Sequence, residues 1–220
     1  MGTMIECPAG PEAFVRGNAT LRSVPHVPEI RLYLSDDALT LWEETERELR
    51  QPDQPPPFWA FAWPGGQALA RYILDHADLV RGRTILDLGS GSGLTAIAAA
   101  MAGASAVLAS ELDPFAIAAI ELNASANDVA IAVTADVLDG SGEDAEVILA
   151  ADVCYETTMA KRVLSLLERA RARGADVLIG DPGRAFLPRH LLRELDAHDV
   201  PVLADLENAP VKRVMILTLA

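Results

Sequence analysis

Short apolar runs alternate with longer amphipathic stretches along most of the chain, from Arg83 onward. Apolar runs bounded by turn residues indicate buried strands, whereas apolar residues at helical spacing indicate helices. The pattern predicts strands at 84–88, 105–110, 131–134, 146–151, 175–180, 200–204 and 212–218. It predicts helices at 92–102, 114–126, 158–173 and 187–197. Such alternation is typical of a doubly wound parallel sheet, in which the carboxyl ends of the strands share one edge.

The last two predicted strands are joined differently from the others. Only the stretch 206–210 separates them, which is too short for a helical crossover, so we expect the final strand to pair antiparallel as a hairpin. The predicted fold class is α/β: a doubly wound, seven-stranded, mostly parallel sheet with the last strand antiparallel, of Rossmann-like topology.

The first quarter of the chain has a different pattern. It predicts, in order, a loosely held arm rich in proline and glycine (1–28), a short strand (29–34), a helix capped by Ser35 (36–49) and an extended linker with four prolines (51–57). We therefore divide the chain into an N-terminal arm and extension, residues 1–57, and a main domain, residues 58–220.

Asp87 closes the first strand of the main domain, and Gly89, Gly91 and Gly93 follow it before the next helix. A carboxylate and a glycine turn at this edge of a parallel sheet indicate a cofactor pocket. A dinucleotide site would need a third glycine where Leu94 stands, and the acid would repel a pyrophosphate but attract an amino group. The pattern resembles the first motif of the class I methyltransferases that use S-adenosylmethionine (SAM). An ordinary strand-to-helix turn is the alternative.

Acidic residues also follow the next two strands. Glu111 ends the second strand, where a carboxylate can accept hydrogen bonds from both hydroxyls of a ribose. Asp113 precedes Pro114 and can equally cap the following helix. After the third strand, Asp136 and Val137 resemble an adenine contact, with the carboxylate on the exocyclic amine and apolar groups on the ring. A simple turn aspartate would also explain Asp136.

The fourth strand ends at Ala151 and leads into Asp152-Val-Cys-Tyr155. An aspartate and a tyrosine three residues apart can face one small cavity, although a helix-capping aspartate beside a packing tyrosine fits too. Methyl transfer from a sulfonium needs in-line attack by a lone pair, so positioning dominates. With a lysine acceptor, Asp152 would orient the amine and Tyr155 would supply an aromatic wall and a hydroxyl acceptor. Trp63, ahead of another helix, is either a lid over the cofactor or a core residue.

The composition restricts the partners. A net charge of −14 disfavours nucleic acid and anionic membranes and would attract a lysine-bearing protein, although acidity can simply serve solubility. With only two cysteines, Cys7 and Cys154, we expect a reducing compartment and no metal site. Neither a signal nor a transit peptide is evident at the N-terminus, and no stretch is apolar enough to span a membrane. We expect a soluble, cytoplasmic monomer.

Motifs occur in this order along the chain: Trp63-Pro-Gly-Gly-Gln, Asp87-Leu-Gly-Ser-Gly-Ser-Gly, Glu111-Leu-Asp-Pro, Asp152-Val-Cys-Tyr155 and Ile179-Gly-Asp-Pro-Gly-Arg184. Over roughly residues 57–190, this set resembles the seven-β-strand protein-lysine methyltransferases. The resemblance is strongest to members that methylate the β-subunit of electron transfer flavoprotein. Glu111, in place of the more usual aspartate, and Cys154, in place of a bulkier residue, depart from the family pattern.

The resemblance implies a protein-lysine N-methyltransferase with SAM as cofactor and electron transfer flavoprotein β as protein substrate. It implies catalytic roles for Asp152 and Tyr155, and cofactor contacts from Trp63, Asp87, Gly89, Gly91, Gly93, Glu111, Asp136, Val137 and Ala151. It also suggests that Asp181 and Arg184 shape the substrate entrance. Without a transit peptide, the chain looks like a bacterial version. A ribosomal protein as substrate, or a non-catalytic SAM-fold binding module, are the alternatives.

Overall fold

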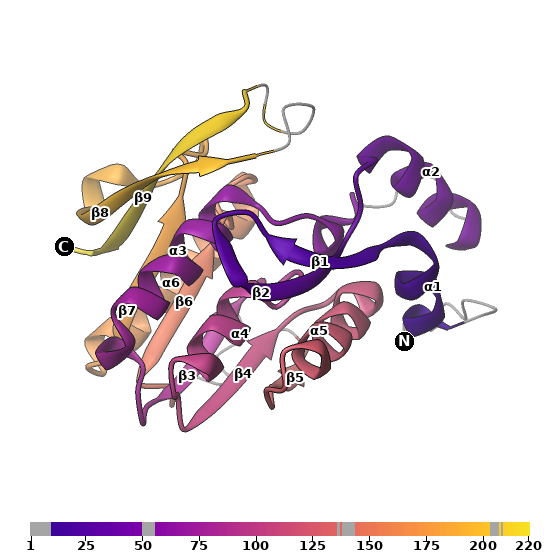
Figure 1. The fold of residues 1–220 in the computed structure, drawn as a ribbon. Helices are drawn as coiled ribbons and strands as arrows, with labels where there is room; N and C mark the ends of the chain where they lie inside the picture. The colour runs from indigo at the N-terminus through magenta and orange to yellow at the C-terminus, as the bar shows by residue number, and fades with distance from the viewer. Residues whose placement is uncertain (1–9, 50–55, 136, 138–143, 203–206, 208) are drawn as a thin grey trace, which may run out of the picture.

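The computed structural model describes residues 10–49, 56–135, 137, 144–202, 207 and 209–220. Figure 1 shows the course of the chain. The helices are α1 (Pro11–Asn18), α2 (Ala38–Leu49), α3 (Pro64–Asp75), α4 (Leu94–Met101), α5 (Pro114–Ala126) and α6 (Thr157–Ala172), with short 3-10 turns η1 (Phe58–Ala60), η2 (Ala77–Leu79) and η3 (Arg189–Leu191). The strands are β1 (Thr20–Val24), β2 (Val27–Leu34), β3 (Thr84–Leu88), β4 (Ala106–Ser110), β5 (Ala132–Thr134), β6 (Val147–Ala151), β7 (Asp176–Asp181), β8 (Leu192–Pro201) and β9 (Val211–Leu219).

Seven of these strands form one sheet, in the order β5-β4-β3-β6-β7-β9-β8. β9 is antiparallel to both of its neighbours, and the remaining neighbours pair in parallel. This confirms the predicted doubly wound sheet with an antiparallel last strand. Because β3 pairs with both β4 and β6, the chain reverses its direction of winding there, and a crevice opens at the carboxyl ends of these strands.

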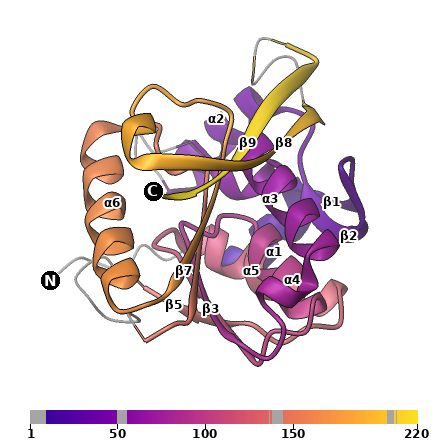
Figure 2. The same ribbon diagram turned by 90° about the vertical axis from the view of Figure 1, so that its left-hand side faces the viewer.

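Helices cover both faces of this sheet. Figure 2 shows α6 on one face and α3 and α4 on the other. The central strands are buried on both sides, which explains their uninterrupted apolar sequences. Leu86 of β3 and Ile148 of β6 pack with α6, while Ile85 and Leu149 of the same strands pack with Ile97 of α4.

The N-terminal region differs from the expected arm, because residues 10–28 contain α1 and β1. β1 and β2 form an antiparallel hairpin. Val24, Val27, Ile30 and Leu32 of this hairpin lie fully buried in the same core as α3 and α4. The proline and glycine content suggested a loose segment, but the buried apolar residues provide enough contact to order it. The predicted strand at 29–34 and helix at 36–49 are confirmed as β2 and α2.

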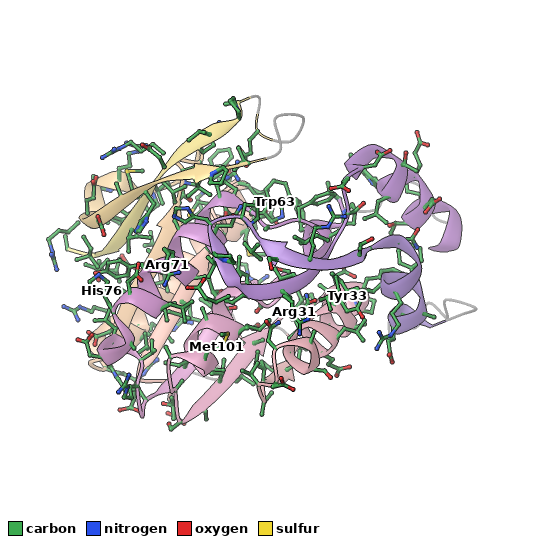
Figure 3. All side chains as sticks on the ribbon, viewed as in Figure 1. Arg31, Tyr33, Trp63, Arg71, His76 and Met101 are labelled. Atoms are coloured by element: carbon green, nitrogen blue, oxygen red, sulfur yellow. The ribbon has the colours of Figure 1, made fainter. Side chains whose placement is uncertain are left out.

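The backbone of β2 is held by asparagine side chains in the last turn and at the C-cap of α5. The Arg31 N–H donates to Asn127 Oδ1 at 2.9 Å, and the Tyr33 N–H donates to Asn123 Oδ1 at 2.8 Å. Figure 3 shows Arg31 and Tyr33 above α5. These amides replace the strand partner that β2 lacks on this side, so they fix the hairpin beside the sheet.

The prediction of a helix at 187–197 is wrong. β8 begins at Leu192 and pairs with β9 along its whole length. Leucine and charged residues favour a helix locally, but the ladder of hydrogen bonds to β9 outweighs that preference. The predicted strand at 200–204 is only the end of β8, which stops at Pro201; the stretch 203–204 lies outside the described residues. The predicted hairpin of the last two strands is confirmed.

Candidate functional site

A cavity of about 600 Å³ lies at the carboxyl ends of β3, β4 and β6. The glycine turn after β3 forms one part of its wall, and the segment from η1 to α3 forms another. The beginning of α6 and the side chain of Arg184 complete the wall. Cavities of this size, roughly 300–1,000 Å³, suit small organic cofactors.

The glycine turn needs glycine for its backbone. Gly89, Gly91 and Gly93 have φ angles of 59°, 54° and 82°, in the left-handed region that other residues rarely adopt. A side chain on Gly93 would also press against Ile120 of α5, at 3.4 Å. Gly89 and Gly91 line the cavity, whereas Gly93 is not among the described residues that line it and instead precedes α4 as its N-cap.

Asp87 lies beneath this turn rather than in the cavity wall. Its side chain is only 1 % exposed and accepts hydrogen bonds from the hydroxyls of Ser90, at 2.5 Å, and Thr95, at 2.6 Å. Burial raises the pKa of Asp87 to about 6, against the opposing effect of these hydroxyls. Ser90 and Thr95 themselves line the cavity. The hydroxyl groups of Ser90 and Thr95 thus lie between the Asp87 carboxylate and the cavity.

Glu111 lines the cavity directly after β4. Its Oε2 accepts the Gly91 N–H at 2.9 Å and its Oε1 accepts the Leu112 N–H at 2.7 Å, so the carboxylate joins the glycine turn to β4. Asp113 caps α5 by accepting the Phe115 N–H at 2.8 Å, and burial raises its pKa to about 6. The helix-cap alternative for Asp113 is therefore confirmed.

Neither of the two predicted adenine contacts, Asp136 and Val137, is among the described residues that line the cavity. Asp136 lies outside the described residues. Val137 is buried in the core between the sheet and α6. Ala151, at the end of β6, does line it.

Asp152 follows β6 in a left-handed conformation, with φ 55°. Its Oδ2 accepts the Gly66 N–H of α3 at 3.1 Å, and its Oδ1 faces the guanidinium of Arg184. Burial raises the pKa of Asp152 to about 6, although the positive charge of Arg184 opposes this effect. The neighbouring Gly65 allows this approach, because a Cβ there would overlap Gly180 O and the Asp152 carboxylate.

Aromatic side chains form the outer part of the cavity. Tyr155 is 49 % exposed, and its ring centroid lies 5.3 Å from that of Phe58. Trp63, labelled in Figure 3, precedes α3 and donates its indole N–H to the Phe58 carbonyl at 2.8 Å. Asp152, Tyr155 and Trp63 thus share one cavity with the glycine turn. Cys154, which lies between Asp152 and Tyr155 in the sequence, is buried. Burial raises its pKa to about 12, so its thiol stays protonated.

The position of Arg184 explains part of the Gly-Asp-Pro-Gly-Arg motif. Asp181 is buried and its Oδ1 accepts the N–H groups of Gly183, at 2.6 Å, and Arg184, at 2.7 Å. This turn directs the Arg184 side chain back toward Asp152. Glu207 binds the same guanidinium, and no motif in the sequence marked it, because the contact joins segments that are far apart in the sequence.

The residues that the structure describes also bear on metal binding and on membrane insertion. Among these residues, no cluster of three or more histidine, cysteine or acidic side chains is arranged to hold a metal ion. None of the helices that they form combines the length and apolar character needed to cross a membrane.

Comparisons with known proteins agree with this geometry. Residues 68–175 match the family described as ribosomal protein L11 methyltransferase (PrmA). The electron transfer flavoprotein beta subunit lysine methyltransferases of Xenopus laevis and Danio rerio are 40 % and 41 % identical to this chain, over 84 % and 76 % of it. The matched regions span 76 % and 64 % of those proteins. The structure of magnesium protoporphyrin IX methyltransferase from Synechocystis with bound SAM has a TM-score of 0.52 at 14 % identity, covering 70 % of this chain and 78 % of that one.

The sheet order and the cavity behind a glycine turn define a class I methyltransferase, for which SAM is the methyl donor. Within that class, the chain belongs to the family of the electron transfer flavoprotein β-subunit lysine methyltransferases.

Proposed function

We propose that this protein transfers methyl groups from SAM to lysine side chains of the β-subunit of electron transfer flavoprotein. The observation that carries the proposal is that Asp152 and Tyr155 open on the same cavity as the glycine turn. The names of the relatives support the choice of substrate. The net charge of −14 supports a lysine-bearing partner through long-range attraction.

The residues of the inner cavity fit SAM. The glycine turn offers backbone without side chains, and the buried carboxylate of Asp87 gives this end of the cavity a negative potential suited to an ammonium group. We assign Glu111 to the ribose hydroxyls, because it lines the cavity one strand further along. Trp63 and Ala151 would cover the cofactor from the outer side. Contacts of Asp136 and Val137 with the adenine stay predictions.

The outer cavity would position the acceptor. SAM supplies a methyl group on a sulfonium, which the lone pair of an uncharged lysine amine attacks in line. Asp152 Oδ2 would accept a hydrogen bond from that amine and so fix the direction of its lone pair. The Tyr155 hydroxyl would accept a second hydrogen bond, and the Phe58 ring would pack beside the lysine methylenes.

The proposed encounter takes place in the cytoplasm, with the enzyme acting as a monomer. Sedimentation of the enzyme alone and of its mixture with the substrate measures the oligomeric state directly. A single species with the mass of one 23.5 kDa chain is the expected result for the free enzyme, and a stable dimer would contradict it.

The direct test is incubation of the purified enzyme with methyl-labelled SAM and purified electron transfer flavoprotein β. Peptide mass spectrometry should locate the label on lysine side chains. The variant Asp152→Asn is the matched negative control, because it keeps the size and most contacts of the side chain. Absence of lysine methylation with the wild-type enzyme, under conditions where SAM binds, would exclude this substrate.

Ribosomal protein L11 is a second candidate substrate, because the matched family description names it. The same assay with purified L11 in place of the flavoprotein subunit distinguishes the two. Label on L11 alone would identify L11 as the substrate. We expect label on the flavoprotein subunit alone.

A further inference from the structure

Asp152 already has a cationic partner within the protein. Its Oδ1 accepts hydrogen bonds from Arg184 Nε, at 3.2 Å, and from Arg184 Nη2, at 2.8 Å. Its Oδ2 accepts the Gly66 N–H at 3.1 Å, and among the hydrogen bonds seen between described residues this is the only one to that oxygen. A carboxylate oxygen accepts two hydrogen bonds, so Oδ2 retains a lone pair for an incoming amine.

Arg184 is itself held in place from several sides. Glu207 accepts from Nη1 at 3.2 Å and from Nη2 at 2.6 Å, and its side chain is only 5 % exposed. The guanidinium carbon lies 5.8 Å from the centre of the Trp63 ring, within the range of a cation–π contact. Burial lowers the pKa of Arg184, but Asp152 and Glu207 together hold it above its ordinary value, so the residue stays charged.

This ion pair affects the chemistry of a lysine acceptor. The nucleophile is the uncharged amine, and lysine with a reference pKa near 10.4 is almost wholly protonated at pH 7. An isolated carboxylate beside the amine would stabilise the ammonium form and raise the pKa further. The positive charge of Arg184 opposes that effect at a distance of 2.8 Å from the carboxylate.

We propose that Arg184 is a positioning residue that compensates the charge of Asp152, so that Asp152 orients the lysine amine without holding it in the protonated form. The inference rests on the proposed function and deepens it, since it selects the protonation state of the acceptor. Arg184 lines the cavity and acts here through Asp152.

Other charged groups around Asp152 also contribute to the electrostatic potential at its carboxylate. Asp181, at the end of β7, adds negative charge, and Glu207 with its neighbour Lys212 adds one charge of each sign from the β8–β9 hairpin. From the side of α3, only backbone groups of Gly65 and Gly66 approach the carboxylate. Tyr155 faces Glu111 and Glu156, and burial raises its pKa, so its hydroxyl stays neutral.

The test compares the pH dependence of kcat in Arg184→Gln and in the wild-type enzyme between pH 6 and pH 10, at saturating SAM and electron transfer flavoprotein β, because kcat reports the pKa values of the bound complex. Without the guanidinium, the pKa of Asp152 and that of the bound lysine both rise, so the profile moves to higher pH by about one to three units. At pH 7 this corresponds to a loss of about tenfold or more. Arg184→Lys, which keeps the charge, should restore the position of the profile, and Arg193→Gln, an exposed arginine on β8, should leave it unchanged.

A purely structural role would lower kcat equally at every pH, and a profile of unchanged position in Arg184→Gln would overturn the inference. A second readout does not depend on the protein substrate. The ¹³C resonance of the Asp152 carboxyl, assigned by its loss in Asp152→Asn, should titrate at a higher pH in Arg184→Gln. If the wild-type enzyme methylates nothing but this midpoint moves, the proposed function fails and the charge compensation stands. If the midpoint stays where it is, the compensation fails.

Discussion

Two aspartates at the carboxyl ends of neighbouring strands, Asp87 and Asp152, have different electrostatic surroundings. Asp87 is 1 % exposed, and the side chain of Asp152 is 12 % exposed. Burial raises the pKa of each to about 6. Asp87 is stabilised by the neutral hydroxyls of Ser90 and Thr95, whereas Asp152 is paired with the charged guanidinium of Arg184.

Because of this difference, the electrostatic potential near Asp87 differs from that near Asp152. Neutral donors stabilise a carboxylate without cancelling its long-range field, so the side of Asp87 attracts a cation, such as the ammonium group of the cofactor. A salt bridge cancels most of that field, so the side of Asp152 can orient an uncharged amine. One fold thus provides a charged end and a compensated end within one cavity.

The largest expected effect is on catalysis in Asp152→Asn. The amide keeps the shape but removes the charged acceptor, so kcat should fall by about 100-fold or more, the range of a group that positions a reacting proton or amine. Calorimetry should show SAM affinity within about threefold of wild type, because the cofactor contacts lie on the other side. Asp199→Asn, an exposed position on β8, is the control; weak SAM binding with normal turnover at saturation would contradict the assignment.

A pair of glycines tests how closely Asp152 must be held. In Gly65→Ala the new methyl group would overlap the Gly180 carbonyl and the Asp152 carboxylate, so we expect a loss of about 1–3 kcal/mol in the free energy of unfolding, together with most of the activity. In Gly66→Ala the nearest atom, Leu94 Cδ2, lies at 3.6 Å, which is an ordinary contact. Urea unfolding should therefore show Gly66→Ala at least as stable as wild type; equal losses in both variants would contradict this packing.

A smaller effect is expected at the other aspartate. Asp87→Asn removes the negative charge beneath the glycine turn, and a charge-assisted interaction of about 1.5 kcal/mol corresponds to roughly tenfold weaker SAM binding. At saturating SAM, kcat should stay close to that of wild type. Calorimetry and a saturation curve measure the two quantities separately, and a large fall in kcat with unchanged affinity would reverse the roles of the two aspartates.

The smallest predicted effect is the pH dependence of stability at Asp87. Its folded-state pKa of about 6 lies above the ordinary value of 3.8, so the folded protein binds the proton more tightly than the unfolded chain. Stability therefore falls as pH rises from about 4 through about 6. Relative to Asp87→Asn, the wild-type protein should lose about 1 kcal/mol of unfolding free energy between pH 5 and pH 7. Urea unfolding of both proteins measures this; parallel curves would show that the pKa is not raised.

The sequence predicted which residues follow consecutive strands better than it predicted contacts between distant segments. Asp87, the three glycines and Glu111 lie on two consecutive strand ends, so local order was enough to bring them together. The pairing of Arg184 with Asp152 and Glu207 joins three separate segments. Such a contact depends on how the strands and the hairpin assemble, which no local pattern encodes.

The same contrast holds for the fold. Most strands of the sheet were predicted within one or two residues, because buried parallel strands have uninterrupted apolar sequences. β8 was misread as a helix, since its alternation is masked by leucines and charges at helical spacing. Its pairing with β9, rather than its own sequence, determines its conformation.

A crystal structure with S-adenosylhomocysteine and a lysine peptide of electron transfer flavoprotein β tests the central claim most directly. The account predicts the cofactor against the glycine turn, the lysine Nζ within hydrogen-bond distance of Asp152 Oδ2, and Arg184 still on Oδ1. A lysine that displaces Arg184 from Asp152, or that binds Glu111 instead, would contradict it.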